Sequence, residues 1–271
     1  MPPPEAALRP PQALALGLLQ GPSELLPISS SAHTALAAQL AGWRYEEIDP
    51  AARKSFEVAL HGGAGLALAV ALRGRLARLD RGQLAALALS LLPPALAGLA
   101  LRGPIERRLG GPRSIAAGLI AGSGAMVAAE VAGGRRSRGC GDARPADALA
   151  LGVAQAFALA PGVSRSGATL AAARARGFGG EPARALSLLT AMPVLTGAGA
   201  LDALRLARRG RGSRGADAHR GARVLGGVAA FASTLACVRA LGGAQRLLPY
   251  AVYRVLLAGA ILRRARRGGA R

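Results

Sequence analysis

The amino-acid sequence predicts an all-α polytopic membrane protein, and its composition and charge pattern both support this prediction. Of 271 residues, 51% are apolar, while 35 Lys and Arg against 14 Asp and Glu give a formal net charge of +21. The charged residues gather between charge-free runs, which cover 25–43, 58–72, 82–101, 114–129, 148–164, 185–201 and 224–238. Several runs approach the ~20 residues that cross a hydrocarbon core ~30 Å thick. Such runs with basic residues between them are typical of multi-pass membrane proteins.

The same figures disfavour a soluble helical bundle and exclude several other classes of protein. A soluble helical bundle would carry a polar face on its helices, and most of these runs have none. Nucleic-acid binding is excluded because aromatic residues make up only 3% of the chain and no basic helix face is continuous. The abundance of apolar residues excludes disorder, and Cys140 and Cys237 are too few for a disulfide scaffold. The basic loops are predicted to contact anionic membrane lipids.

The first twelve residues are rich in proline and lack both the basic start and the cleavage site of a signal peptide. We therefore expect the first membrane segment to be retained. The loop charges give no orientation, because 73–81 carries four Arg and one Asp while 102–113 carries four Arg and one Glu.

The second half of the chain resembles the first when the sequence is shifted by 135 residues. Gln20 then meets Gln155. Two ungapped stretches also match at this offset, 29–34 with 164–169 and 60–66 with 195–201. Two matches at one offset indicate a duplication. We therefore expect a single membrane domain over 1–271, built from pseudo-repeat halves of roughly 1–135 and 136–271.

Each half holds one interrupted segment followed by three apolar segments. The interrupted segments, roughly 12–42 and 148–172, are broken by Pro22, Pro27, Pro161, Gly162 and Gly167. Interrupted segments at corresponding positions of two halves predict broken or re-entrant helices near the membrane midplane. Three full spans per half is an odd number, so the second half would enter the membrane from the opposite side. The two interrupted segments would then meet at the centre.

The first interrupted segment gathers a carboxylate, three hydroxyls and an imidazole inside an apolar run: Glu24, Ser29, Ser30, Ser31 and His33. Ionisable groups within a membrane are costly, and for that reason they are functional candidates. The alternative is that Glu24 marks a helix end at the interface and that the serines cap the next helix. That alternative leaves His33 without a role, so we favour a reactive site.

The second interrupted segment reads Pro161-Gly-Val-Ser-Arg-Ser-Gly-Ala-Thr169. Its small residues allow a tight turn that exposes backbone N–H groups, and hydroxyls flank Arg165. N–H groups at a helix N-terminus together with a guanidinium fork suit a phosphate group. The alternative is a loop whose arginine reaches the lipid headgroups. The repeat disfavours that alternative, because it places Arg165 opposite Ser30.

Together these groups predict phosphoryl chemistry on an amphiphilic substrate. Glu24 is the candidate ligand of a divalent cation, Mg²⁺ or Ca²⁺, that bridges phosphate oxygens. Three routes stay open: Ser30 attacks phosphorus with His33 as general base, His33 attacks directly, or His33 activates water. Arg165 would offset the charge that grows on the phosphate oxygens. The other polar motif residues are predicted to bind the substrate: Gln20, Ser29, Ser31, Ser164, Ser166, Gly167 and Thr169.

These motifs resemble those of the undecaprenyl-diphosphatase family, the bacitracin-resistance-type integral membrane phosphatases. The first is Gln20-Gly-Pro-Ser-Glu24 leading into Pro-Ile-Ser-Ser-Ser-Ala-His33, and the second is Pro161 to Thr169 as quoted above. Shorter matches extend the resemblance over essentially the whole chain in order, at 56–58, 191–193, 200–202 and 249–254. The second motif is intact and highly specific.

The resemblance implies hydrolysis of undecaprenyl diphosphate to undecaprenyl phosphate and phosphate, with dependence on a divalent cation. This reaction recycles a lipid carrier for peptidoglycan and other envelope polymers. The resemblance also implies about six transmembrane helices plus two re-entrant helical segments in an inverted-topology repeat. It places the protein in the bacterial plasma (inner) membrane with the active site facing outward. Carried over by position, Glu24, Ser30, His33 and Arg165 match the family's proposed active residues.

The sequence departs from the family pattern at several positions. Gln20 stands where many members have Glu, which makes direct metal ligation there less expected, and Ala32 replaces a common Gly. Asp202 is predicted to be structural, whereas Arg254 is open between helix pairing and a second phosphate contact. The Arg-rich stretch 205–223 is predicted to be a loop.

The alternative function is a transporter that moves polyprenyl phosphate or another anion without hydrolysis, since inverted repeats with broken helices are common in transporters. A transporter needs no nucleophile and base, so the clustering of Ser30 and His33 with Glu24 favours an enzyme. The sequence leaves open whether a homo-oligomer forms and whether lipid flipping accompanies hydrolysis.

Overall fold

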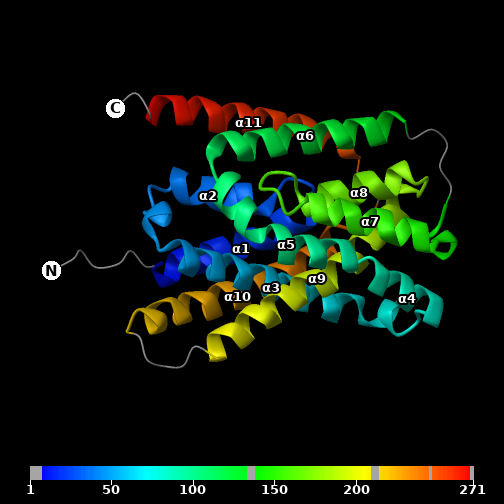
Figure 1. Cartoon of the computed structure of the whole chain (residues 1–271), viewed down its shortest axis with the longest axis horizontal. Coiled ribbons are helices and arrows are strands. Elements are labelled where there is room, and N and C mark those ends of the chain that lie inside the picture. Colours follow the sequence, from blue (N-terminus) through cyan, green and yellow to red (C-terminus); the bar gives the residue numbers. More distant parts are fainter. Residues whose placement is uncertain (1–7, 133–137, 209–213, 244–245, 269–271) are drawn as a thin grey trace. The chain divides into compact units, whose positions relative to one another are not determined.

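A computed structural model describes residues 8–132, 138–208, 214–243 and 246–268, and most of these residues are helical (Figure 1). The α-helices are α1 (Pro10–Leu25), α2 (Ser30–Leu40), α3 (Pro50–Leu76), α4 (Arg81–Leu89), α5 (Leu92–Arg108), α6 (Pro112–Val131), α7 (Pro145–Phe157), α8 (Arg165–Ala175), α9 (Gly180–Arg208), α10 (Arg214–Ala240) and α11 (Leu247–Gly268). Two 3-10 helices are η1 (Tyr45–Glu47) and η2 (Cys140–Asp142). Within the described ranges no strand occurs beyond an isolated bridge between Arg138 and Phe178. The all-α prediction is confirmed.

Helix boundaries repeat along the chain at the offset that the sequence indicated. Helices α1 and α7 begin at Pro10 and Pro145, and α6 and α11 begin at Pro112 and Leu247, each pair 135 residues apart. Helices α2 and α8 correspond at both ends by the same shift. Each half therefore holds one interrupted helical pair, α1–α2 or α7–α8, followed by longer helices.

The described helices identify a multi-pass membrane protein. Five segments are long and apolar enough to cross a membrane: Pro50–Leu76, Arg81–Leu101, Pro112–Val131, Gly180–Arg205 and His219–Ala240. Helix α11 has the length for a sixth span, with 22 residues, but it carries Arg254 and further arginines near its end. The helices of the interrupted pairs have 16, 11, 13 and 11 residues, so each is too short to cross alone, as the re-entrant prediction requires.

The chain divides into two compact units. Unit 1 comprises Met1–Leu25, His33–Arg73 and Met192–Leu241, and unit 2 comprises Leu26–Ala32, Gly74–Ala191 and Gly242–Arg271. Each unit contains helices from both halves of the repeat. In unit 1, α1 of the first half packs on α10 of the second, and in unit 2, α7 of the second half packs on α4 and α5 of the first. These pairings correspond to one another under the repeat.

Glycines allow the helices of unit 1 to approach closely. A Cβ atom on Gly17 would lie 2.5 Å from the carbonyl oxygen of Gly226, so α1 and α10 meet through bare backbone. Helices α3 and α9 also meet at glycines, since a Cβ atom on Gly199 would lie 2.8 Å from the Cα atom of Gly62. Such small residues are typical of helix interfaces in membranes. A Cβ atom on Gly65 would lie 2.6 Å from the backbone nitrogen of Thr196, so α3 and α9 run antiparallel.

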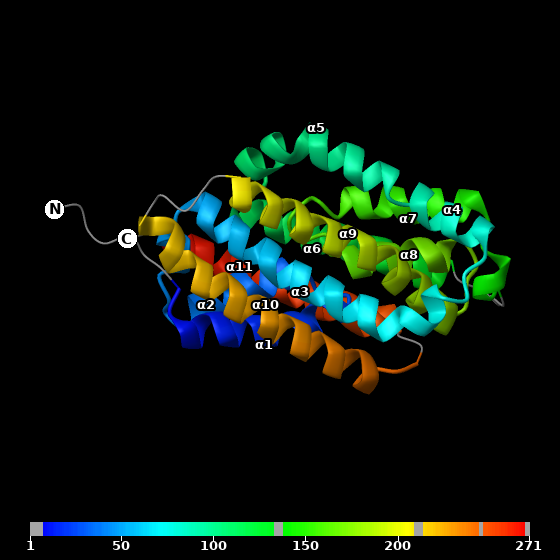
Figure 2. The same cartoon turned by 90° about the horizontal axis from the view of Figure 1, so that it is seen from below.

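Helices α6 and α11 lie side by side in unit 2 (Figures 1 and 2). Near the end of α6, Glu130 Oε2 accepts a hydrogen bond of 3.1 Å from the backbone nitrogen of Leu247, where α11 begins. At the other end of the pair, Pro112 at the start of α6 and Leu262 near the end of α11 line one pocket. The two helices are therefore antiparallel. Because both α3 with α9 and α6 with α11 are repeat counterparts, the repeat is inverted, as predicted.

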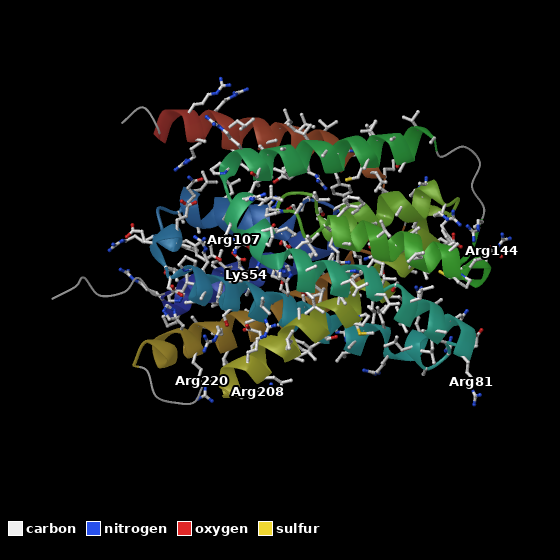
Figure 3. The ribbon with its side chains drawn as sticks, in the orientation of Figure 1. Lys54, Arg81, Arg107, Arg144, Arg208 and Arg220 are labelled. Carbon is white, nitrogen blue, oxygen red and sulfur yellow. The ribbon has the colours of Figure 1, made fainter. Side chains whose placement is uncertain are left out.

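Basic side chains gather near helix ends. Figure 3 labels six of them, Lys54, Arg81, Arg107, Arg144, Arg208 and Arg220, and each lies within two turns of a helix end. This placement agrees with the predicted arrangement of charges between apolar runs. It also corrects the prediction of a loop over 205–223, because α9 continues to Arg208 and α10 begins at Arg214, leaving 209–213 outside the described residues. Alanine and arginine are strong helix formers, and they extend both helices past the apolar runs.

The structure gives Asp202 a structural partner. Its Oδ2 atom accepts a hydrogen bond of 2.7 Å from the hydroxyl of Ser55, which joins α9 to α3 within unit 1. Asp202 was predicted to be structural, and this contact between helices agrees with that interpretation.

Candidate functional site

The chain breaks its helix between α1 and α2 with an unusual backbone conformation. After α1 ends at Leu25, the chain makes a tight turn. In this turn the backbone nitrogen of Ile28 donates a hydrogen bond of 2.8 Å to the carbonyl oxygen of Leu26. Ser29 then adopts a φ of +77°, in the left-handed region that non-glycine residues rarely occupy. Its hydroxyl lies 3.4 Å from that of Ser31 in the first turn of α2.

The break between α7 and α8 also contains a serine with positive φ. Ser164 adopts a φ of +67°, and its hydroxyl lies 3.3 Å from that of Ser166 and accepts from the backbone nitrogen of Gly167. Ser29 and Ser164 are the two non-glycine residues with positive φ in the described part of the chain, and they are repeat counterparts. Strained backbone of this kind clusters at functional sites. The two breaks are therefore strong candidates for the reactive region.

The two breaks lie side by side in unit 2. The hydroxyl of Ser166 donates to the carbonyl oxygen of Leu26 at 2.9 Å, across a sequence distance of 140 residues. Arg254 of α11 contacts both segments. Its Nη1 atom donates to the carbonyl oxygen of Pro27 at 3.2 Å, and its Nη2 atom donates to the carbonyl oxygen of Val163 at 2.9 Å. The prediction that the interrupted segments meet is confirmed for residues 26–32 and 161–169.

Arg254 has no exposed surface, and all but one of its hydrogen-bond partners are main-chain carbonyl groups. Besides the two breaks, its guanidinium donates to the carbonyl oxygen of Leu119 on α6 at 3.3 Å and lies 3.5 Å from the sulfur of Met126. A guanidinium committed to carbonyl oxygens in this way is not available to a phosphate group. Of the two roles that the sequence left open for Arg254, the structure favours helix pairing.

Arg165 begins α8 and is half-buried, so part of its side chain remains accessible. Its Nη1 atom donates to the carbonyl oxygen of Ser187 at 3.3 Å. The hydroxyl of Thr169, one turn further along α8, lies 2.6 Å from that of Ser187 and donates to the carbonyl oxygen of Arg165 at 2.9 Å. Gly167 is needed for packing, because a Cβ atom there would lie 2.7 Å from Arg254 Nη1. Arg165 is thus held at the start of α8, the end of a helix that favours anions.

A second polar group lies in unit 1 and contains a residue that the sequence analysis missed. Glu24 Oε2 accepts a hydrogen bond of 2.9 Å from Gln20 Nε2, and His61 Nδ1 of α3 lies 3.1 Å from the same carboxylate oxygen. Glu24 and Gln20 are 4% and 1% exposed, so this carboxylate is buried and paired. The signal that could have found His61 was an imidazole inside the charge-free run 58–72.

The predicted site residues divide between the two units. Gln20, Glu24 and His33 belong to unit 1. Those of unit 2 are Ser29, Ser30, Ser31, Ser164, Arg165, Ser166, Gly167 and Thr169. The structure thus brings the serine clusters of both motifs together, and it separately brings Gln20 and Glu24 together with His61.

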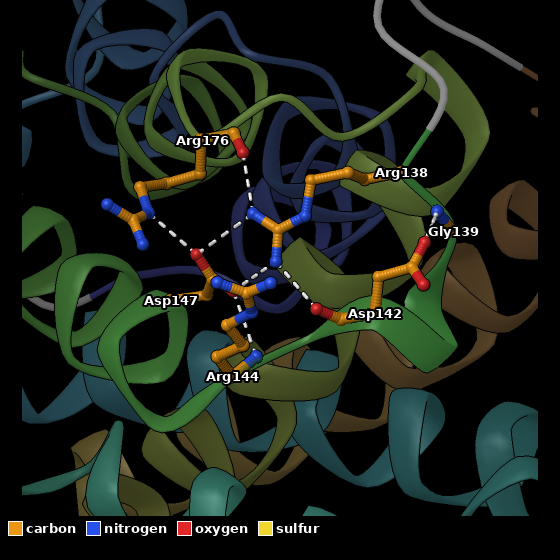
Figure 4. A network of polar contacts seen from close by, with 6 residues as sticks. All are labelled: Arg138, Gly139, Asp142, Arg144, Asp147 and Arg176. Atoms are coloured by element: carbon orange, nitrogen blue, oxygen red, sulfur yellow. Dashed lines mark hydrogen bonds and ion pairs between the residues drawn. The ribbon is translucent and has the colours of Figure 1, made fainter.

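A buried carboxylate holds the ends of α7 and α8 together on the side away from the break (Figure 4). Asp147, whose side chain is 1% exposed, accepts from Arg138 Nη2 at 2.6 Å and from Arg176 Nε at 2.6 Å. The backbone nitrogen of Arg144 donates to it at 2.9 Å. Burial would raise the pKa of Asp147, but the hydrogen bonds outweigh burial and lower the pKa to about 2.

This network predicts acid sensitivity that resides in Asp147. Because its pKa is lowered on folding, its contribution is complete above the unfolded pKa near 3.8 and is lost as the pH falls towards 2. The contribution is about 2 kcal/mol. The melting temperature of the protein in detergent should fall between pH 4 and pH 2, and Asp147→Asn should melt lower at pH 7 with a shallower acid dependence. An unchanged acid dependence in Asp147→Asn would contradict this assignment.

Comparison with known proteins adds a family match. The sequence model of one family, described as "Bacitracin resistance protein BacA", matches residues 13–260. This range contains both helix breaks and all the predicted site residues.

Individual relatives match over nearly their whole length. A protein from Geobacter sulfurreducens named undecaprenyl-diphosphatase is 37% identical in an alignment that covers 92% of this chain and 96% of that protein. A protein of the same name from Nitrosococcus oceani is 37% identical, covering 92% of this chain and 96% of its own. A third, from Thioalkalivibrio sulfidiphilus, is 32% identical, covering 93% and 97%.

Proposed function

Because the chain belongs to the bacitracin resistance protein BacA family, we propose that it is an undecaprenyl-diphosphatase. It hydrolyses undecaprenyl diphosphate to undecaprenyl phosphate and inorganic phosphate, and the lipid monophosphate returns to cell-wall synthesis. The observation that carries this proposal is the contact between the two helix breaks, where Ser166 donates to Leu26 and Arg254 holds both turns. That contact gathers hydroxyls, a helix N-terminus and Arg165 in unit 2, and together these groups suit a phosphate.

The residues of the two motifs take separate roles in this proposal. Arg165 and the N–H groups at the start of α8 bind the phosphate oxygens and offset the charge that develops on them. The attack on phosphorus follows one of three routes: Ser30 attacks with His33 as general base, His33 attacks directly, or His33 activates water. The serines at the breaks and Gln20 orient the diphosphate.

Glu24 fits a divalent cation, Mg²⁺ or Ca²⁺. Its carboxylate is buried and oriented by Gln20, and Mg²⁺ in proteins is commonly held by one or two carboxylates together with phosphate oxygens of the substrate. When bound, the cation would neutralise part of the diphosphate charge.

The apolar helices support a lipid substrate that enters from the bilayer. The polyprenyl chain would remain among the membrane-facing side chains while the diphosphate reaches the helix breaks. We propose that the protein lies in the bacterial plasma membrane with its active site facing outward.

Phosphate release tests the proposal directly. Purified protein in detergent should release phosphate from a C55 or C15 prenyl diphosphate when Mg²⁺ or Ca²⁺ is present, and a chelator should abolish the release. The same protein in liposomes measures the alternative function. Movement of prenyl phosphate across the bilayer by folded protein that releases no phosphate would establish transport and overturn the proposal.

A further inference from the structure

Three polar atoms of unit 1 form a nearly equilateral triangle. Gln20 Nε2 lies 2.9 Å from Glu24 Oε2 and 3.0 Å from His61 Nδ1, and His61 Nδ1 lies 3.1 Å from Glu24 Oε2. Each of the three atoms lies close to both of the others, so the ends of the three side chains face one another. Two of the side chains are nearly fully buried, and that of His61 is 30% exposed. The His61 side chain is therefore partly accessible to solvent.

The amide determines which atoms are acceptors. An amide nitrogen can only donate a hydrogen bond, so His61 Nδ1 must accept one from Gln20 Nε2. The imidazole proton of His61 then lies on its other ring nitrogen, His61 Nε2. A half-turn of the amide about its last bond exchanges its nitrogen for its oxygen without changing the three edges. With the amide turned and Nδ1 of His61 unprotonated, the triangle consists of three acceptor atoms, one nitrogen and two oxygens. Three converging acceptors of this kind suit a bound cation.

The edges match one face of an octahedron around a small cation. Ligands at ~2.1 Å from Mg²⁺ or a similar ion, at right angles, lie ~3.0 Å apart. The observed edges are 2.9, 3.0 and 3.1 Å. The described residues contain no group of three His, Cys, Asp or Glu placed to hold a metal, so a site here needs the Gln20 amide as its third ligand.

The repeat indicates that this set belongs to the first half alone. The counterparts of Gln20, Glu24 and His61 are Gln155, Leu159 and Thr196. The second half keeps the amide but has neither the carboxylate nor the imidazole. The candidate cation ligands therefore occur in the first half of the repeat and not at the corresponding positions of the second.

We propose that His61 is a ligand of the divalent cation, completing a facial set with the Gln20 amide oxygen and the Glu24 carboxylate. This inference rests on the proposed function and adds a nitrogen ligand to it. Three further positions remain for diphosphate oxygens and water. Because imidazole favours transition metals while Ca²⁺ prefers oxygen ligands, the site should bind Mn²⁺ more tightly than Ca²⁺.

Electron paramagnetic resonance of Mn²⁺ tests the ligand without turnover. Full-length protein in detergent, with no substrate, should bind Mn²⁺, and electron spin echo modulation should report a directly coordinated ¹⁴N. His61→Ala should lose the nitrogen coupling and weaken Mn²⁺ binding at least about tenfold. His61→Gln supplies an oxygen instead, so it should retain much of the binding and lose the coupling. The matched control, His219→Ala on α10, should keep both.

The outcomes separate this inference from the proposed function. Nitrogen coupling that persists in folded His61→Ala and His61→Gln, or a wild-type Mn²⁺ spectrum without it, would overturn the assignment of His61 even if the protein releases phosphate. A wild-type protein that binds Mn²⁺ through His61 but releases no phosphate would instead refute the phosphatase and leave the cation site standing. Melting temperatures of each variant show whether it is folded.

Discussion

Replacing Arg165 with alanine is expected to lower kcat for phosphate release about 10³-fold. The guanidinium lies at the start of α8, anchored by the carbonyl oxygen of Ser187, and it is half-buried beside a helix N-terminus. A fixed cation in such a position stabilises the charge that builds on phosphate oxygens in the transition state more than the charge of the bound substrate. The loss should therefore appear mainly in kcat and less in KM.

The measurement is steady-state phosphate release by detergent-purified variants with unchanged melting temperatures. Arg165→Lys keeps the charge but loses the fork that matches phosphate oxygens, so it should retain intermediate activity. Arg81→Ala, which removes an exposed arginine at the start of α4, is the matched control and should be fully active. Full activity in Arg165→Ala would remove Arg165 from the site.

Replacing Arg254 with methionine is expected to destabilise the protein by about 3 kcal/mol or more and to abolish activity through loss of structure. The guanidinium is fully buried and donates to carbonyl oxygens of both helix breaks and of α6. Methionine fills a similar volume but removes the donors to the carbonyl oxygens of Pro27 and Val163 at the two breaks, and each buried acceptor left unpaired costs about 1–3 kcal/mol. The strained turns at Ser29 and Ser164 would lose the side chain that holds them together.

Thermal melting and amide hydrogen exchange measure this effect. Arg254→Met should melt at a lower temperature, and exchange should accelerate at residues 26–29 and 162–164. Arg254→Lys keeps one donor group and should be intermediate. If Arg254→Met melts like the wild type but loses activity, Arg254 acts on the substrate, which was the second role that the sequence left open.

The contrast between Arg165 and Arg254 shows what sequence reasoning could reach. Arg165 was found because hydroxyls and glycines surround it in one continuous motif, and the repeat placed it opposite Ser30. Arg254 could not be interpreted in the same way, because its partners are main-chain carbonyl oxygens of residues as far away as Pro27. A main-chain acceptor leaves no trace in the side-chain pattern, so the role of Arg254 needed coordinates.

The helix breaks were predictable in position but not in conformation. Proline and glycine residues in both interrupted segments indicated where the helices would stop, and the offset of 135 residues predicted that the two breaks correspond. Nothing in the sequence indicated that Ser29 and Ser164 would take a positive φ, because this conformation favours glycine, as at Gly162 with a φ of +91°. The sequence analysis missed His61 because its contact with Glu24 depends on how α3 packs against α1, and the sequence does not specify that packing.

The central claim is that the two motifs hydrolyse a prenyl diphosphate at its terminal phosphorus, and isotope labelling tests it most directly. Purified protein is incubated with undecaprenyl diphosphate and Mg²⁺ in H₂¹⁸O, and both products are analysed by mass spectrometry. All three open routes, through Ser30, His33 or activated water, place one ¹⁸O atom in the released phosphate and none in undecaprenyl phosphate. Label in the lipid product, or intact substrate after incubation with folded protein, would contradict this account.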